Sequence, residues 1–506
     1  MSFLMGIDIG TSSVKSMVME HSGKILGFAQ IEYDINIPIS GYAEQNPDEW
    51  WELVKKTSAQ ALNKAGISGR ALEGIGFSGQ MHGLVVLDKD AQVLRPSIIW
   101  CDQRTIAQKA TLESMVTMEQ LGDMIQNPVS TGFMILSLMW IKENEPDIYN
   151  RIDRVMLPKD YVRYRLTGEI GTDTTDASGT SLFDTASLHW SESLLAIAGM
   201  ESRMLPPVGK PWEIAGCVTR EAESESCFIA GTPVVYGGAD QAMQAVGNGI
   251  INSGDISVTI GTGGQLFTTI DQPVYDKRLR THTYVHAIPD RWYLLGATMS
   301  AGLSLKWLAS QVLKSKDYKA LDLKAREIAA GSEGLLFLPY LTGDRTPHMD
   351  PQASGMFFGL TLDHHEAHLI RAVLEGVCYS LRDGVEIIRS LGVDLRRIII
   401  SGGGAKSQLW SQILADILNR DVYVSTVEEQ ACVGASIMAG VGVSRFDSVE
   451  QACKTVVRLH EHPVQPNLGN QAVYDRNYAV YRKLYEQNRE LFPILKNSTN
   501  ANGVSK

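Results

Sequence analysis

Two glycine turns, far apart in the chain, have the composition of anion-binding loops. In the first, Asp8-Ile9-Gly10-Thr11, a carboxylate ends an apolar run and small residues follow. The second is Gly261-Thr262-Gly263-Gly264. Backbone N–H groups in such turns can converge on an anion, and two turns facing each other would grip a phosphate chain. A plain β-hairpin explains either turn equally well when it is taken alone.

A third glycine segment, Gly402-Gly403-Gly404-Ala405-Lys406-Ser407, lies between an apolar run at 398–401 and a helical pattern. A strand, a glycine loop and a helix in that order let the backbone approach a nucleotide closely. The P-loop pattern fails because no glycine stands directly before Lys406, and the dinucleotide fingerprint fails because Ser407 replaces its third glycine. A tight turn that binds nothing is the alternative.

Two further polar segments each follow an apolar run that is typical of a buried strand. Asp240 and Gln241 come after Gly237-Gly238-Ala239. Asp240 could take a proton from a substrate hydroxyl, although a helix N-cap is the simpler interpretation of an isolated aspartate there. The other segment offers hydrogen-bonding groups among glycines, as a polyol pocket requires, although a lone buried histidine is usually structural; it consists of Gln80, Met81 and His82.

The elements that position these segments predict a duplicated α/β fold. Residues 3–9, 14–19 and 25–31 are expected to form an antiparallel meander, and 256–260 with 265–270 repeat its first hairpin. Both hairpins carry Ile-Gly-Thr at the turn, which indicates two related domains, although Ile-Gly-Thr is common at hairpins. We expect domains at 1–247 and 248–496, with a disordered tail at 497–506.

Composition excludes several classes of protein. The chain of 506 residues is 44% hydrophobic, which fits a globular protein and rules out a disordered or fibrous one. A net charge of −11 without a basic run argues against nucleic acid and anionic membranes as partners. Six scattered cysteines without a C-x-x-C pair and the lack of a membrane-length apolar run predict a cytoplasmic protein.

Several longer motifs together resemble the FGGY carbohydrate kinases, and most closely the xylulokinase members of that family, over essentially the whole chain. The strongest runs from Gly355-Met356-Phe357-Phe358-Gly359-Leu360 through His368-Leu369 to Ala372-Val373-Leu374-Glu375. Others are Ser78 to Gly83, Leu157-Pro158-Lys159-Asp160-Tyr161, Asp176-Ala177-Ser178-Gly179-Thr180, Arg345-Thr346-Pro347-His348, and Gly402 to Ser407 with Trp410.

The resemblance implies two ribonuclease-H-like domains flanking a central cleft, and a kinase that phosphorylates D-xylulose at O5 with ATP. It makes Asp240 the catalytic base and Asp8 the residue that organises Mg²⁺ through water. It assigns sugar binding to Gln80, Met81, His82, Asp240 and Gln241. The ATP site would comprise Thr11, Gly261, Thr262, Gly263, Gly403, Gly404, Ala405 and Ser407, with residues 430–436 on its far side. A second copy of the chain is a further candidate partner.

Two departures from the family pattern leave alternatives open. Leu136-Ser137 stands where the family has Pro-Lys, on the sugar side, so another ketose or polyol such as ribulose, arabinitol or glycerol is an alternative acceptor. Residues 430–433 replace the usual Gly-Pro-Ala-Leu near the nucleotide. Other classes remain: a nucleotide-driven interaction protein like actin or the chaperone ATPases, and a sugar sensor without activity, which the intact Asp8 and Asp240 disfavour.

Overall fold

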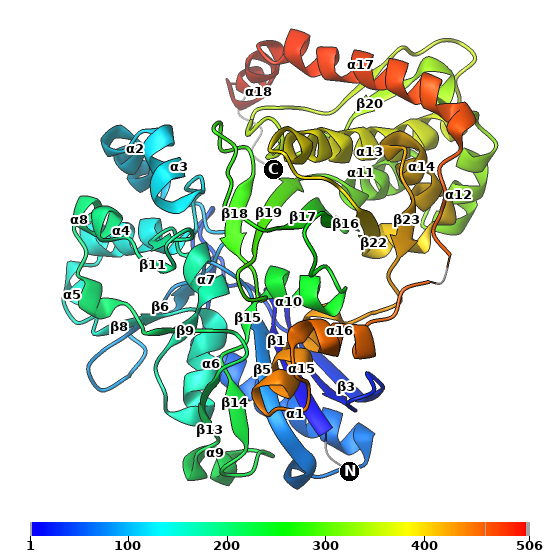
Figure 1. Cartoon of the computed structure of the whole chain (residues 1–506). Coiled ribbons are helices and arrows are strands. Elements are labelled where there is room, and N and C mark those ends of the chain that lie inside the picture. Colours follow the sequence, from blue (N-terminus) through cyan, green and yellow to red (C-terminus); the bar gives the residue numbers. More distant parts are fainter. Residues whose placement is uncertain (1–2, 461, 502–506) are drawn as a thin grey trace.

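The first glycine turn joins two strands of a mixed sheet near the N-terminus, as seen in the computed structural model, which describes residues 3–460 and 462–501 (Figure 1). Three antiparallel strands form the predicted meander, and two parallel strands continue the sheet from its first strand. Across the sheet the order is β13 (Ile214–Cys217), β14 (Pro233–Val235), β5 (Leu72–Gly79), β1 (Phe3–Ile9), β2 (Ser13–Met19) and β3 (Ile25–Glu32).

A second sheet repeats this plan around the second glycine turn. Its meander is again antiparallel, and two parallel strands again extend it from the first strand of the meander. The predicted internal repeat is therefore confirmed at the level of topology. The order is β18 (His282–Val285), β19 (Trp292–Thr298), β17 (Gly264–Ile270), β16 (Asp255–Ile260), β22 (Arg397–Ser401) and β23 (Val422–Val424).

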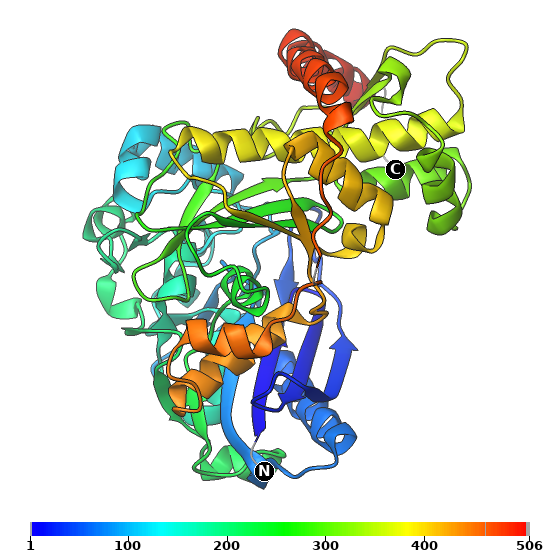
Figure 2. The ribbon, with the colours of Figure 1, turned by 45° about the vertical axis from the view of Figure 1, so that its right-hand side comes forward.

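Helices cover the sheets where the sequence places their caps. Helix α1 (Pro47–Ala65) packs on β2 and β3; Asn46 accepts a hydrogen bond from the Asp48 N–H, and Gly66 ends the helix in the left-handed region. Helix α13 (Glu366–Ser390) lies across the strands of the second sheet (Figure 2). It buries one broad apolar face in the largest hydrophobic core of the described chain.

A long segment is inserted between β5 and β14, and much of it forms the lobe at the left of Figure 1. Helices of this inserted segment are α2 (Ile106–Met115), α3 (Met118–Ile125), α4 (Met134–Asn144), α5 (Pro146–Tyr149), α6 (Pro158–Thr167), α7 (Thr174–Gly179), α8 (Glu192–Ala198) and α9 (Arg220–Glu225). α2, α3, α4, α5 and α8 enclose an apolar core of their own, whereas α6 and α9 contribute to the core beneath the first sheet.

Two helices cross between the sheets. α10 (Asp240–Gly247) and α15 (Gln430–Gly442) touch backbone to backbone, since a Cβ on Gly247 would lie 2.0 Å from the Gln430 carbonyl oxygen. α15 packs on β1 and β5 of the first sheet, whereas α10 shares a core with Phe267 of the second sheet. These two helices thus join the two domains, and the division at residue 247 stays a proposal.

The end of the chain was expected to be disordered over residues 497–506. Residues 497–501 complete α18 (Leu491–Ala501), and residues 502–506 lie outside the described part of the chain. The expectation for the final residues is therefore untested.

Candidate active site

The first glycine turn, Asp8 to Thr11 between β1 and β2, is held in place by side chains from distant segments of the chain. The Gly10 N–H donates to the Ser13 carbonyl oxygen at 3.0 Å, which closes the turn. Trp100 Nε1 donates to Thr11 Oγ1 at 2.8 Å, and Gln45 Nε2 donates to the Thr11 carbonyl oxygen at 2.7 Å. The hydroxyl and the carbonyl oxygen of Thr11 are therefore both hydrogen-bonded to distant side chains, so the turn has a fixed shape before any ligand binds.

The second glycine turn, Gly261 to Gly264 between β16 and β17, is held in place by hydrogen bonds from the segment that follows β19. Gly302 donates from its backbone N–H to the Gly261 carbonyl oxygen at 2.8 Å, and Ala301 donates to the Thr262 carbonyl oxygen at 3.0 Å. A Cβ on Gly263 would lie 2.8 Å from the Thr298 carbonyl oxygen. Only glycine fits there, which leaves the backbone of this turn open to a ligand.

The third glycine segment, residues 402–407, packs directly against Ile260 at the start of the second glycine turn. A Cβ on Gly402 would meet the Ile260 carbonyl oxygen at 2.8 Å, and one on Gly404 would meet Ile260 Cγ2 at 2.5 Å. Gly403 is exposed, with open space where its side chain would point. Ser407 caps α14 (Gln408–Leu418) and also donates to the Asp322 carboxylate at 2.8 Å, so its hydroxyl serves the helix start.

Asp8 and Asp240 lie at the carboxyl ends of two strands that both pair with β5. Asp8 pairs in register with Ser78 of β5, and Ser78 pairs with Gly238 of β15 (Gly238–Ala239), directly before Asp240. Ser78 Oγ donates to Asp8 Oδ1 at 2.7 Å. Asp240 is the first residue of α10, while Ala239 is its N-cap, so the simpler N-cap interpretation of Asp240 does not hold.

The electrostatics of this pair suit proton transfer. Burial, reinforced by the negative charge of Asp8, raises the pKa of Asp240 to about 7, against hydrogen bonds from Gln241 that lower it. Burial also raises the pKa of Asp8, although Lys15 and the Ser78 hydrogen bond oppose it. A carboxylate with a pKa near neutrality can accept a proton at physiological pH and release it again.

Sequence reasoning gave no role to a buried network behind Asp240. The Ala239 N–H donates to Thr175 Oγ1 at 2.8 Å, and that hydroxyl donates to Asp173. Asp173 Oδ2 lies 2.7 Å from Lys159 Nζ, and both side chains are fully buried. Lys159 and its neighbours had been quoted only as motif residues, because nothing in the local sequence connects 159, 175 and 239.

His82 forms the wall of the pocket expected for the sugar. Its ring stacks on Phe133 with centroids 3.8 Å apart, and Nδ1 lies 2.5 Å from the Gly179 carbonyl oxygen. Burial lowers the pKa of His82 to about 4, so the ring is neutral. A carbonyl can only accept, so Nδ1 carries the proton and Nε2 can accept a hydrogen bond from a sugar hydroxyl.

Gln80 and Met81, which precede His82 in the chain, are more deeply buried than residues on a ligand-binding surface would be. Met81 is 5% exposed and joins the core cluster that contains α10. Gln80 is 1% exposed, and its Nε2 donates to Gln45 Oε1 at 2.8 Å, behind the first glycine turn. The structure thus connects Gln80 to Thr11 through Gln45. Phe133, which sequence reasoning missed, contacts His82 instead.

Both departures from the family pattern fall in packed regions. Leu136 and Ser137 of α4 are fully buried, and Leu136 belongs to the core of the inserted segment. Residues 431–436 are buried along α15, where a Cβ on Gly6 would lie 2.0 Å from the Cys432 carbonyl oxygen. Residues 431–436 therefore pack between β1 and α10, and the expectation that 430–436 lie on the far side of the ATP site stays a prediction.

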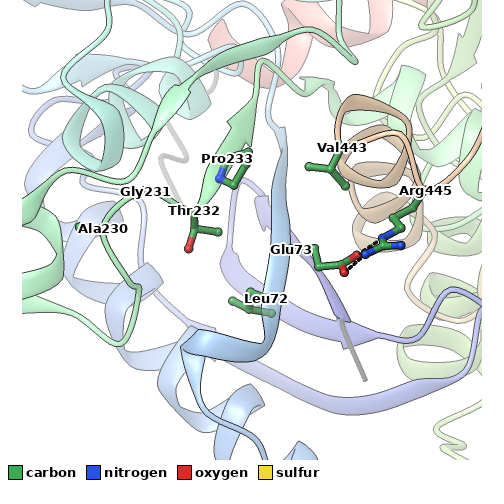
Figure 3. A pocket seen from close by; sticks show the side chains of 8 residues that line it. All are labelled: Leu72, Glu73, Ala230, Gly231, Thr232, Pro233, Val443 and Arg445. Atoms are coloured by element: carbon green, nitrogen blue, oxygen red, sulfur yellow. Dashed lines mark hydrogen bonds and ion pairs between the residues drawn. The ribbon is translucent and has the colours of Figure 1, made fainter.

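A separate hollow lies at the other end of the first sheet. Its walls include the start of β5 and the segment after α15, where Arg445 pairs with Glu73 (Figure 3). Six residues of extended strand separate Leu72 from Ser78, which corresponds to about 20 Å. The hollow is therefore remote from the carboxyl-end cluster around Asp8, where ligands bind in parallel sheets.

Comparison with known proteins identifies the family. Residues 3–247 match the N-terminal domain of the FGGY family of carbohydrate kinases, and residues 256–443 match its C-terminal domain. The chain belongs to the FGGY family of carbohydrate kinases. This FGGY kinase therefore has the expected α/β fold of two domains in the actin and sugar-kinase superfamily, and it is an enzyme.

Relatives of this FGGY kinase cover it almost completely. It is 33% identical to the xylulose kinase of Bacillus subtilis over 98% of this chain and 99% of the relative. The crystal structure of xylulose kinase from Rhodospirillum rubrum superposes with a TM-score of 0.91 at 30% identity, covering 97% of this chain and 99% of that one. A Bacillus subtilis gluconokinase is 30% identical over 91% of each chain.

The metal and membrane findings are limited to the described residues. No group of three or more His, Cys, Asp or Glu side chains there could hold a metal ion by itself. The Asp8 carboxylate, close enough to Asp240 for its charge to raise the Asp240 pKa, suits a Mg²⁺ ion that arrives with a nucleotide, since Mg²⁺ usually takes few protein ligands beside phosphate oxygens and water. Across residues 3–460 and 462–501, no helix has the length and apolarity to cross a membrane.

Proposed function

We propose that this FGGY kinase transfers the γ-phosphoryl group of ATP to O5 of D-xylulose, forming D-xylulose 5-phosphate and ADP. The observation that carries the proposal is Asp240, a carboxylate of raised pKa beside Asp8 at the strand ends between two glycine turns. Similarity to xylulose kinases over nearly the whole chain supports the choice of sugar. The cytoplasm is the compartment we propose, since all six cysteines are unpaired.

In this proposal Asp240 accepts the O5 proton as O5 attacks the γ-phosphorus. Phosphoryl transfer passes through a loose transition state, so the protein contributes positioning and charge stabilisation. The backbone N–H groups of the two glycine turns, which include Thr11 and residues 261–263, would hold the phosphates. The nucleoside would lie along the exposed Gly403 and the partly buried Ala405, next to the second turn.

Asp8 is the residue we propose for Mg²⁺, with water between the carboxylate and the ion. When bound, the ion supplies positive charge to the β- and γ-phosphate oxygens. The hydrogen bond from Ser78 and the opposite charge of Lys15 oppose the rise that burial causes in the pKa of Asp8. His82 Nε2 would accept a hydrogen bond from a sugar hydroxyl, and Gln241 would orient the carboxylate of Asp240. Closure of the domains would exclude water, which competes as acceptor.

Another ketose or a polyol is the alternative acceptor, and the gluconokinase among the relatives shows that sugar acids are used by similar chains. A coupled assay of ADP release across D-xylulose, D-ribulose, D-arabinitol, glycerol and D-gluconate tests the proposal. We expect the highest kcat/KM with D-xylulose. A higher kcat/KM with another acceptor would replace the sugar, and ATP hydrolysis that no acceptor changes would replace the kinase assignment by a nucleotide-driven interaction protein.

A further inference from the structure

Arg345 lies on the wall of a cavity between the inserted segment and the second domain. The cavity has a volume of about 700 Å³. Ser130 and Thr131 line it from the inserted segment, and Met299 and Arg345 line it from the second domain. Thr131 is two residues before Phe133, the stacking partner of His82, so this cavity leads toward the pocket proposed for the sugar. The motif that contains Arg345 has no role in the mechanism above.

The backbone around Arg345 is tied to the second sheet. The Thr346 N–H donates to the Ala297 carbonyl oxygen at 2.8 Å, and the Ala297 N–H donates to Thr346 Oγ1 at 3.1 Å. Thr346 Oγ1 also donates to the Arg280 carbonyl oxygen at 2.8 Å. Arg345 therefore starts from a fixed point beside β19, and its side chain is placed without any ligand.

The guanidinium of Arg345 has no ion-pair partner among the described residues, and it is only partly exposed. The adjacent Asp344 does not compensate it, because Asp344 Oδ1 accepts from Thr298 Oγ1 at 3.1 Å and burial raises the pKa of Asp344 well above its usual value. Burial lowers the pKa of Arg345, opposed only by Tyr284. A desolvated cation without a partner is costly, so a ligand that accepts hydrogen bonds would fit here.

Arg345 lies near the ring cluster around His82. The positive charge of Arg345 contributes, after burial, to the low pKa of His82 and of His282, and Tyr284 opposes the effect of burial on the pKa of Arg345. The His82 and Tyr284 centroids are 6.1 Å apart, and Tyr284 stacks on His282 with centroids 5.4 Å apart. Tyr284 is buried in the core, whereas His82 and His282 are partly exposed. An acceptor bound at His82 would therefore lie close to the guanidinium of Arg345.

The chemistry of the acceptor matches this placement. A 2-ketopentose closes its furanose ring by adding O5 to the C2 carbonyl, so O5 is free to attack phosphorus only in the open-chain form. The reactive sugar therefore carries a free carbonyl oxygen at the end away from O5. A carbonyl oxygen only accepts hydrogen bonds, and a guanidinium only donates them.

We propose that Arg345 binds the C2 carbonyl of the open-chain acceptor and makes the enzyme select ketoses over their reduced polyols. The proposal rests on the proposed function, because it assumes that O5 lies at Asp240. It assigns to this cavity the recognition of an oxygen-rich end of the acceptor. A carboxylate, which accepts in the same way, would be held by the same guanidinium.

The test compares D-xylulose with xylitol and D-arabinitol, the two products of reducing its C2 carbonyl. Arg345→Met keeps the length of the side chain and removes its donors, and Arg345→Lys keeps one charged donor. Arg278→Met is the matched control, since Arg278 lines the same cavity but is exposed. For Arg345→Met we expect kcat/KM for D-xylulose to fall about 10- to 100-fold, the range for a hydrogen bond to a charged group. The values for the polyols should change less than about threefold, so the ketose preference shrinks.

The remaining readouts separate recognition from damage to the fold. The KM for ATP and the melting temperature of Arg345→Met should stay near those of wild type, Arg345→Lys should recover part of the ketose preference, and Arg278→Met should retain it. An Arg345→Met enzyme with an unchanged ratio of D-xylulose to polyol activity would overturn the proposal while leaving the kinase function intact. Wild-type enzyme that phosphorylates none of the three acceptors would overturn both.

Discussion

The negative charge of Asp8 raises the pKa of Asp240 across the end of β5, which separates their two strands. Ser78 of β5 lies between them in register, paired with Asp8 on one side and with Gly238 on the other. Burial is the larger cause and brings the pKa of Asp240 to about 7. The same strand ends therefore place a base of suitable strength next to a second carboxylate that can attract a cation with the phosphates.

Replacing Asp240 by asparagine should remove the proposed base. We expect kcat to fall by about 10²- to 10⁴-fold, the usual contribution of general base catalysis, while sugar binding measured by calorimetry persists. Asp383→Asn is a matched control: Asp383 also has a pKa raised to about 7, by burial, but it lies in α13, where Tyr478 Oη donates to it at 2.6 Å. Near-full turnover of Asp240→Asn would remove Asp240 from the role.

The dependence of kcat/KM on pH should report the same pair. A base must be deprotonated, so the rate should fall as pH drops through the pKa of about 7 of Asp240. Asp8→Asn removes a charge that raises this pKa, so the acidic limb of the residual activity should move to lower pH. Steady-state rates between pH 5 and pH 9 would show it. A limb that stays in place in Asp8→Asn would mean that another group titrates.

Much of this scaffold could be predicted from the sequence because its signals are local. The two glycine turns, the strands that flank them and the capped start of α1 at Asn46 each lie within a few residues. Repetition of Ile-Gly-Thr indicated two related domains, and the place of Asp240 after a buried strand made it a candidate base, although only the resemblance to the FGGY kinases favoured that role over an N-cap. Each of these features depends on neighbours in the chain rather than on contacts across the fold.

The supporting contacts could not be predicted because they join segments far apart in the chain. Thr175 meets Ala239 across 64 positions. Phe133 stacks on His82 from the inserted segment, and its own sequence context resembles any apolar helix start. The apolar pattern of α15 predicts a buried helix but not which sheet covers it, and only the resemblance to the FGGY kinases implied that residues 430–436 lie beside the ATP site.

Thr175 should matter through the backbone that carries Asp240. Thr175→Val keeps the shape of the side chain but leaves the Ala239 N–H and Asp173 without their shared partner. We expect kcat to fall about tenfold or more with a smaller change in the KM for ATP, because displacing the base affects the chemical step. Thr175→Ser keeps the hydroxyl and should restore most of kcat. Equal losses in Thr175→Val and Thr175→Ser would indicate a role of the methyl group in packing instead.

Gly403 and Gly404 allow nucleotide binding to be separated from packing. A Cβ on Gly403 would meet only the Ile260 carbonyl oxygen at 4.0 Å, whereas a Cβ on Gly404 would lie 2.5 Å from Ile260 Cγ2. Gly404→Ala should therefore lower stability by about 1–3 kcal/mol, as overpacking does. Gly403→Ala should leave the melting temperature unchanged and raise the KM for ATP about tenfold, since a methyl group there occupies space proposed for the nucleoside. An unchanged KM for ATP in Gly403→Ala would place the nucleoside elsewhere on the second domain.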